Sequence, residues 1–230
     1  MNYAIILSGG VGSRMKSNIP KQYIERNGVP IIIDTLFAFE KCENIDKIIV
    51  VAADAWKDKI SEWCAENSFI KVCSITTGGD SRQESILNGL KVCMTMSYSE
   101  KDKVIIHDAV RPFVTFDTIN ACLEAIEHYD GAMPVLEVKD TIYQSDDGKV
   151  VTALLNRDTL FAGQSPEAFL LHKYYEINKD LSKEELGEIR GTSQIAFQHG
   201  FSIKMINGDE NNFKLTTPAD LERYYKIKGE

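Results

Sequence analysis

A glycine-rich loop directly after the first apolar run is the segment best suited to bind phosphate. It reads Leu7-Ser8-Gly9-Gly10-Val11-Gly12-Ser13-Arg14-Met15. Glycines let backbone N–H groups approach phosphate oxygens closely. Arg14 follows the glycines and Lys21 follows in Pro20-Lys21-Gln22, so two cations converge on whatever the loop holds. The alternative, a glycine-rich turn with solvated charges, leaves the Pro-Lys-Gln element unexplained.

Two other phosphate-binding patterns fit the loop poorly. The P-loop string G-x-x-x-x-G-K-[ST] does not occur in the sequence. A dinucleotide fingerprint would need a third glycine where Met15 stands, and no clear acidic strand end follows ~20 residues downstream. An NAD-dependent oxidoreductase is therefore disfavoured.

Asp108 is the candidate metal ligand, because it follows the apolar run Val104–His107. Ligands of open α/β sheets bind at the carboxyl ends of the strands. Mg²⁺ takes few protein carboxylates together with phosphate oxygens and water. The alternative is that Asp108 only pairs with Arg111. His107 is expected to be a hydrogen-bonded strand residue and not a catalyst.

The elements that must position these residues alternate between strands and helices. Apolar runs predict strands at Tyr3–Leu7, Ile48–Ala53, Ile70–Ile75, Val104–His107 and Ala132–Val138. Helices are predicted over Ala55–Asn67 with Asp54 as its cap, after the capping box Ser81–Glu84, after Asp117, and after the cap Thr217. Fully apolar strands alternating with helices indicate an α/β fold, with a mostly parallel sheet covered on both faces.

One segment departs from this alternation. Thr141–Gln144 and Val150–Leu155 flank Ser145-Asp146-Asp147-Gly148, which predicts a β-hairpin with glycine at positive φ. No repeat, low-complexity tract or linker is found. We therefore expect a single domain over residues 1–230, with residues 139–160 as a projecting arm.

Composition excludes several classes of protein. The 230 residues carry a net charge of −8, which disfavours a nucleic-acid binder. No apolar stretch approaches the ~18 residues of a membrane span, and the N-terminus lacks the basic region of a signal peptide. Five scattered cysteines without C-x-x-C spacing indicate buried, reduced thiols. We expect a cytoplasmic protein without membrane or nucleic-acid partners.

The ordered motifs resemble those of the cytidylyltransferases that act on methylerythritol phosphate and ribitol 5-phosphate. The resemblance runs from Ala4 to the terminal helix. Beyond the glycine loop and Pro20-Lys21-Gln22, the matching motifs are Gly78-Gly79-Asp80-Ser81-Arg82-Gln83-Glu84-Ser85, His107-Asp108-Ala109-Val110-Arg111-Pro112-Phe113, Lys139-Asp140-Thr141, Asn156-Arg157, Gly163-Gln164-Ser165-Pro166, and Asn212-Phe213-Lys214-Leu215-Thr216-Thr217-Pro218-Ala219-Asp220.

The resemblance implies a fold and a reaction. The fold is Rossmann-like, of the nucleotide-diphospho-sugar transferase type. The reaction is the Mg²⁺-dependent transfer of a cytidylyl group from CTP to a polyol phosphate. Because two polyanions must meet, such a site works mainly by neutralising charge and positioning the reactants.

The resemblance also implies the site residues. The catalytic residues would be Arg14, Lys21, Asp108 and Lys214, with Asp108 as the metal ligand. The CTP-binding residues would be Leu7, Ser8, Gly9, Gly10, Gly12, Gly79, Asp80, Ser85 and Ala109. The acceptor phosphate would be bound by Arg111, Asp140, Thr141, Arg157 and Lys214. For Arg82 two roles stay open: a part in binding, or a purely structural role as a brace of its loop.

In the family, the arm exchanges across a two-fold homodimer and reaches the neighbour's acceptor. We therefore expect a homodimer, the commonest symmetric assembly. Arg157 would clamp the acceptor phosphate through its planar guanidinium.

Two departures concern the acceptor half. The family usually has Thr-Asp-Glu-Ala before its penultimate helix, whereas this chain has Ile189-Arg190-Gly191-Thr192-Ser193-Gln194, without a carboxylate. Gln164-Ser165-Pro166-Glu167 stands where the family has Gln-Thr-Pro-Gln. Gly9-Gly10 and the segment 107–113 resemble the ribitol-phosphate branch more closely.

The predicted acceptor is therefore D-ribitol 5-phosphate, and 2-C-methyl-D-erythritol 4-phosphate is the alternative. Two further alternatives stay open. One is a nucleotidyltransferase for another sugar or polyol phosphate. The other is a nucleotide-binding protein without catalysis, which would not require Arg14, Lys21 and Asp108 together.

Overall fold

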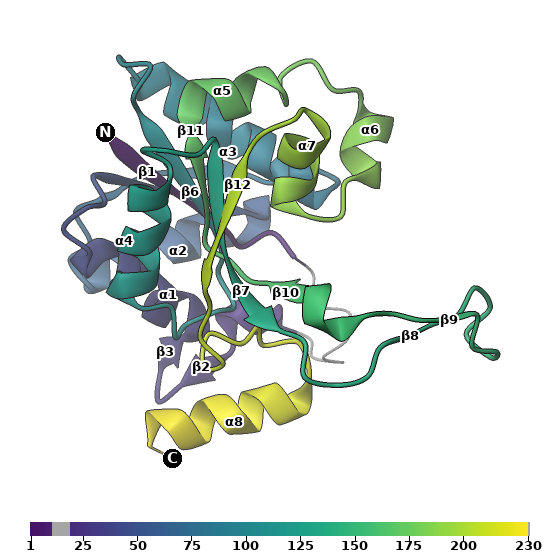
Figure 1. The fold of residues 1–230 in the computed structure, drawn as a ribbon. Helices are drawn as coiled ribbons and strands as arrows, with labels where there is room; N and C mark the ends of the chain where they lie inside the picture. The colour runs from purple at the N-terminus through teal and green to yellow at the C-terminus, as the bar shows by residue number, and fades with distance from the viewer. Residues whose placement is uncertain (11–18, 230) are drawn as a thin grey trace.

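The alternating apolar runs form an eight-stranded sheet in the computed structural model, which describes residues 1–10 and 19–229 (Figure 1). The strand order is β10-β7-β11-β6-β1-β4-β5, and β12 pairs with β7. The strands are β1 (Asn2–Leu7), β4 (Lys47–Ala52), β5 (Val72–Thr77), β6 (Lys103–Asp108), β7 (Gly131–Glu137), β10 (Phe161–Gly163), β11 (Glu167–Leu170) and β12 (Ile203–Asn207). The run β6-β1-β4-β5 is parallel, whereas β10 and β11 run antiparallel to their neighbours.

Helices cover both faces of the sheet, as predicted. The side chains of β1 alternate between two apolar cores: Ala4 and Ile6 face one, Tyr3 and Ile5 the other. The first core is closed by α1 (Ile31–Lys41), α2 (Lys57–Glu66) and α4 (Phe116–Ala125). The second is closed by α3 (Arg82–Met96), α5 (Leu171–Glu176) and α7 (Thr192–Gln198). The α/β fold with two covered faces is thus confirmed.

The remaining elements lie around this sandwich. They are the short pair β2 (Glu25–Arg26) and β3 (Val29–Pro30), the helix α6 (Lys183–Glu188), and the terminal helix α8 (Pro218–Lys228). Single turns of 3-10 helix occupy Lys21–Tyr23, Asp54–Trp56 and Arg157–Thr159. A small third core joins α8 to the loop after β6, through Tyr224, Val110 and Leu215.

Two helix starts follow the predicted caps. Thr217 and Asp220 form a complete capping box at α8. Ser81 caps α3 by accepting the N–H of Glu84 at 3.0 Å. The reciprocal bond of the predicted box is displaced by one residue, since Glu84 Oε2 accepts the N–H of Asp80 at 2.7 Å.

The prediction for α2 is wrong at its start. The helix begins at Lys57 after a 3-10 turn, and no side chain caps it. Asp54 does not cap it, because its carboxylate accepts a hydrogen bond from the hydroxyl of Thr77, at the end of the neighbouring strand β5. The contact of Asp54 with Thr77 on the neighbouring strand thus takes the place of the predicted bond to the start of the helix.

The predicted hairpin forms and projects from the body as an arm (Figure 1). Its strands β8 (Tyr143–Gln144) and β9 (Ala153–Leu154) pair antiparallel and are shorter than predicted. Gly148 has a φ of 70°, as the turn required. The arm exposes apolar side chains, with Tyr143 62% and Leu154 65% exposed.

Two predictions from composition can be compared with the structure. All five cysteines are free and four are buried, but Cys73 on β5 is exposed, contrary to the expectation for all five. Within residues 1–10 and 19–229, no helix is both long enough and apolar enough to cross a membrane.

Candidate active site

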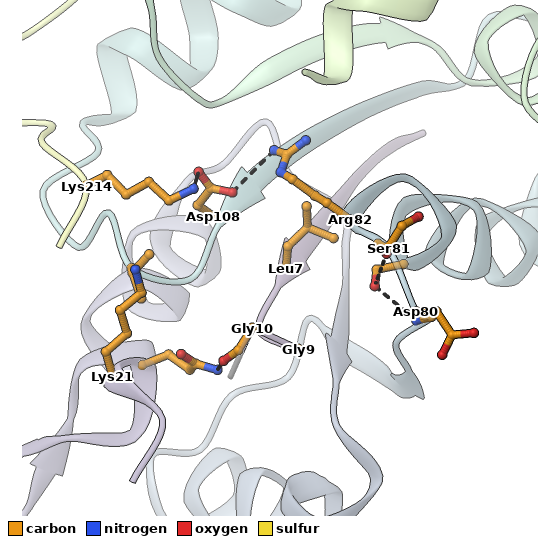
Figure 2. A pocket seen from close by; sticks show the side chains of 13 residues that line it. Leu7, Gly9, Gly10, Lys21, Asp80, Ser81, Arg82, Asp108 and Lys214 are labelled. Atoms are coloured by element: carbon orange, nitrogen blue, oxygen red, sulfur yellow. Dashed lines mark hydrogen bonds and ion pairs between the residues drawn. The ribbon is translucent and has the colours of Figure 1, made fainter. Parts of the chain in front are cut away.

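A cavity of about 440 Å³ opens at the carboxyl ends of β1 and β6, the edge predicted to bind ligands. Figure 2 shows Lys214 and Arg82 reaching Asp108 from opposite sides, while the ammonium group of Lys21 points toward the same space. We call this space the donor cavity. Its lining residues are Leu7, Gly9, Gly10, Lys21, Gln22, Gly79, Asp80, Ser81, Arg82, Ser85, Asp108, Val110 and Lys214.

Gln22 fastens the Pro-Lys-Gln element to the glycine loop. Its side-chain amide donates to the carbonyls of Ser8 at 2.6 Å and Gly10 at 2.8 Å. These bonds hold Lys21 at the mouth of the loop. Among residues 1–10 and 19–229, no atom lies within 4 Å of where a side chain at Gly9 or Gly10 would begin. Gly12 and Arg14 lie outside the described residues.

Asp108 at the end of β6 is surrounded by three cations. Arg82 Nη2 lies 3.2 Å from Oδ1, and Lys214 Nζ lies 2.9 Å from Oδ2. Arg111 Nε is 3.6 Å from Oδ2. The sequence offered two interpretations of Asp108, a partner of Arg111 or a metal ligand at the binding edge. Its position fits both, because Asp108 pairs with Arg111 and also lines the donor cavity.

The electrostatics of this cluster favour an ionised Asp108. Burial acts to raise the pKa of its carboxyl, but Arg82, Lys214 and Arg111 together outweigh burial and hold the pKa well below its usual range. One negative charge against three positive charges leaves the cluster at +2. A cavity wall with this charge is suited to phosphate groups.

Arg82 has a larger role than the sequence indicated. Its guanidinium donates to Asp108 and, through Nη1, to the hydroxyl of Thr192 at 2.6 Å. It thereby ties α3 to β6 and α7. The long side chain of Arg82 therefore braces the cluster and also lines the cavity.

The loop between β5 and α3 forms the far wall of the donor cavity. The N–H of Gly79 donates to Ser85 Oγ at 3.0 Å. Gly79 and Ser85 both line the donor cavity, and their contact with the nucleoside stays a prediction. The carboxylate of Asp80 instead points away from the cavity (Figure 2). It pairs with Lys183 at 3.4 Å.

Two of the predicted CTP-binding residues serve the scaffold. Ser8 is buried, and its hydroxyl bonds to that of Tyr23 at 2.8 Å. Ala109 is fully buried and accepts a bond from Thr35 Oγ1 at 2.8 Å. Neither residue lines the donor cavity as far as the structure describes it.

A second cavity of about 350 Å³ adjoins the first and shares Arg82, Asp108 and Lys214 with it. We call it the acceptor cavity. Arg111, predicted to bind the acceptor phosphate, lines it and donates to the carbonyl of Asn212 at 2.6 Å. The other lining residues are Met133, Gly163, Gln164, Ser165, Glu167, Arg190, Gly191, Thr192, Ser193 and Gln194.

Asp140, Thr141 and Arg157 are not brought to this cavity within one chain. They belong to the arm, where Arg157 Nη1 donates to the carbonyl of Lys139 at 2.7 Å. Arg157 is exposed, with a side chain 54% accessible. Thr141 and Arg157 line a separate hollow on the arm together with Leu154, Leu155, Asn156 and Asp158.

The site has no protein-only metal cage in the part of the chain that the structure describes, since no group of three or more His, Cys, Asp or Glu side chains gathers there. A metal ion at Asp108 would therefore need oxygen ligands from the substrate. The ionised carboxylate between two cavities for phosphates fits that requirement.

Comparisons with known proteins agree with this geometry. The family model "IspD: 2-C-methyl-D-erythritol 4-phosphate cytidylyltransferase" matches residues 2–227. A 2-C-methyl-D-erythritol 4-phosphate cytidylyltransferase of Lachnospira eligens is 36% identical over 224 residues, 96% of each chain. A ribitol-5-phosphate cytidylyltransferase of Streptococcus agalactiae serotype Ia is 29% identical over 230 residues, covering 100% of this chain and 95% of that one.

The similarity extends to solved structures. The 4-diphosphocytidyl-2C-methyl-D-erythritol synthase of Anaerococcus prevotii superposes with a TM-score of 0.80 at 26% identity, covering 100% of this chain and 96% of that one. The predicted fold type is confirmed by this match.

Proposed function

Because the chain belongs to the IspD family of 2-C-methyl-D-erythritol 4-phosphate cytidylyltransferases, we propose that its two adjoining cavities bring CTP and a polyol phosphate together. The protein is a nucleotidyltransferase that acts on a polyol phosphate. The observation that best supports the assignment of the cavities is the cationic cluster at Asp108, which both of them share.

The reaction joins two phosphates at this cluster. An oxygen of the acceptor phosphate attacks the α-phosphorus of CTP and forms the new P–O bond. The bond from that phosphorus to the bridging oxygen breaks, and diphosphate leaves with the electron pair. Lys21 and Lys214 line the donor cavity, so they can offset the charge that builds on the α-phosphate. No general base is needed, because the attacking phosphate is already ionised.

Asp108 would hold Mg²⁺ together with phosphate oxygens of CTP. When bound, the ion would supply charge neutralisation on the triphosphate. Lys214 would have to release Oδ2, and its side chain, 35% exposed, has room to do so. Activity should be lost in excess chelator and return with added Mg²⁺. Full activity in chelator would contradict this assignment.

The acceptor is the finer part of the proposal. The higher identity of the methylerythritol-phosphate enzymes supports 2-C-methyl-D-erythritol 4-phosphate as the first candidate. The motifs at Gly9-Gly10 and 107–113 support D-ribitol 5-phosphate as the second, and that sequence-based preference stays a prediction. Diphosphate release should be measured with CTP, ATP, GTP and UTP against both polyol phosphates. Release with none of these pairs would overturn the proposed function.

We also propose a homodimer in which each arm completes the partner's acceptor cavity. Two features of the described chain support this. The arm exposes apolar side chains such as Tyr143 and Leu154, and its Arg157 lies outside the acceptor cavity of its own chain.

Subunit mixing tests the shared site. With the polyol phosphate held below its wild-type KM, Lys21→Ala and Arg157→Ala homodimers should each be inactive or nearly so. A heterodimer has one site with both lesions and one with neither, so an equimolar, fully exchanged mixture should regain about a quarter of wild-type activity. The control is a homodimer of the double variant Lys21→Ala, Arg157→Ala, in which every site carries both lesions and no activity should return. A monomeric mass, or no recovery despite proven exchange, would refute the shared site.

A further inference from the structure

Glu167 is a buried acidic side chain of the acceptor cavity that the transfer step does not use. It begins strand β11, opposite Ile106 on β6, and is only 7% exposed. The other charged side chains lining that cavity, apart from Asp108, are the cations Arg82, Arg111, Arg190 and Lys214. Glu167 therefore introduces a negative charge into a wall that is otherwise suited to phosphate.

Hydrogen bonds from the start of α7 hold this carboxylate in place. The N–H of Ser193 donates to Oε2 at 2.9 Å, and the hydroxyl of Ser193 donates to the same oxygen. The hydroxyl of Thr192 contributes a further side-chain bond. Burial raises the pKa of the Glu167 carboxyl, while the nearby charge of Arg82 and the bonds from Ser193 and Thr192 act in the opposite direction and favour the charged form. Arg82 itself donates to Asp108 and Thr192.

The carboxylate retains capacity for a ligand. Two carboxylate oxygens offer about four acceptor positions, and an ionised carboxylate accepts hydrogen bonds without donating any. A ligand group that meets the ionised form of Glu167 must therefore be a donor. A phosphate oxygen would be repelled there, whereas a hydroxyl group would be bound.

We propose that Glu167 is a specificity-determining residue, which reads hydroxyl groups of the acceptor while Arg111 and Lys214 receive its phosphate. The acceptor cavity then has a cationic end and a carboxylate end, matching the two ends of a polyol phosphate. The inference rests on the proposed function, and it adds a hydroxyl-reading group to that same site.

A purely structural role makes a different prediction. Glu167 accepts the N–H of Ser193 in the first turn of α7, so it also acts as a helix cap supplied from a strand. Glu167→Gln keeps a side-chain oxygen for that N–H but removes the charge. If Glu167 only stabilised α7, this variant would affect all ligands of the cavity alike.

The test compares two probes of the acceptor cavity, the polyol phosphate that the wild type turns over and inorganic phosphate as an inhibitor. Glu167→Gln should raise KM for the polyol phosphate roughly tenfold to hundredfold, the loss of a hydrogen bond to a charged group. Inhibition by inorganic phosphate should stay equal or strengthen, because a nearby negative charge is gone. KM for CTP should not change.

Deoxy analogues of the acceptor, each lacking one hydroxyl, give the second readout. The wild type should discriminate against at least one of them, and Glu167→Gln should lose that discrimination. Glu185→Gln is the matched control, since Glu185 completes the exposed capping box of α6 and does not line the cavity. Glu167→Asp, which keeps the charge, should retain preference for the hydroxylated acceptor if Glu167→Gln proves too unstable to assay.

Two failures can be told apart. If the wild type releases no diphosphate with any polyol phosphate, the proposed function fails and this inference fails with it. If the wild type is active and Glu167→Gln keeps every discrimination ratio, or weakens polyol phosphate and inorganic phosphate equally, the inference alone is overturned.

Discussion

His107 should make the folded protein sensitive to mild acid. It is fully buried on β6, directly before Asp108. Its Nε2 lies 3.0 Å from the carbonyl oxygen of Arg111, which can only accept, so Nε2 must carry the hydrogen. Its Nδ1, 3.1 Å from Ser165 Oγ, then accepts from that hydroxyl. Both nitrogens of the neutral ring are satisfied, whereas a second proton would reverse the bond to Ser165 and place a positive charge in a fully buried site.

The magnitude follows from the pKa. Burial is the main cause that lowers the pKa of His107, to about 4. The carbonyl of Arg111 and the charge of Asp108 act in the opposite direction without overcoming burial. In the unfolded chain the ring has its ordinary pKa of about 6.5. Between about pH 6.5 and pH 4 only the unfolded state binds the proton, so stability falls as the pH falls. About 2.5 pH units correspond to roughly 3 kcal/mol of unfolding free energy.

Urea denaturation at about pH 7 and about pH 4.5 measures this loss. Carboxyl groups also titrate in this range, so the informative quantity is the difference between the wild type and His107→Gln. Glutamine keeps an amide donor and a carbonyl acceptor but does not titrate. The wild type should lose roughly 2–3 kcal/mol more than the variant over this interval. His128→Gln, at an exposed position, is the control and should follow the wild type. Equal losses in wild type and His107→Gln would refute the reasoning.

Four further outcomes are expected. Lys21→Ala should lower kcat by roughly 10²–10³ while weakening CTP binding less, because its charge matters most in the transition state; wild-type turnover would remove Lys21 from the mechanism. Asp108→Asn should lower the unfolding free energy by roughly 3–5 kcal/mol, since it leaves three cations without their anion. In metal-free buffer CTP should then raise the Tm of this variant more than that of the wild type, and an equal rise would contradict the charge argument. Ser81→Ala should cost about 1 kcal/mol in urea denaturation through the lost cap of α3, and an unchanged midpoint would mean that the cap is dispensable. Arg157→Ala should raise KM for the polyol phosphate with little change for CTP, so a matching rise for CTP would argue against an acceptor-specific clamp.

Part of the donor cavity could be predicted from the sequence because the signals for that part are local. The glycine loop lies directly after β1, and Lys21 is held to it by Gln22 in the same short stretch. Ser81 predicts the start of α3, and Gly79 and Ser85, which lie close to it in the chain, line the cavity. Residues that are neighbours in the chain remained neighbours in the site.

The acceptor half could not be predicted in the same way. The elements that build it are short: β10 has three residues, β11 four and α7 seven. Such segments contain too few residues for a period of 2 or 3.6 to stand out. The two segments noted as departures, around Glu167 and around Ser193, are 26 residues apart and meet only because β11 lies between β6 and β7.

The same argument applies to the charge of the site. The whole chain has a net charge of −8, yet the cluster at Asp108 has a charge of +2. Arg82, Arg111 and Lys214 come from a helix start, a loop after a strand and a segment before the terminal helix, and each alone is indistinguishable from a solvated surface cation. The parallel pairing of β1 and β6 sets Asp108 beside Leu7, so Arg82 and Lys214, which pair with Asp108, line the same cavity as Gly9 and Gly10. The fold therefore concentrates positive charge locally in an acidic protein, and a polyanionic substrate responds to that local field more than to the net charge.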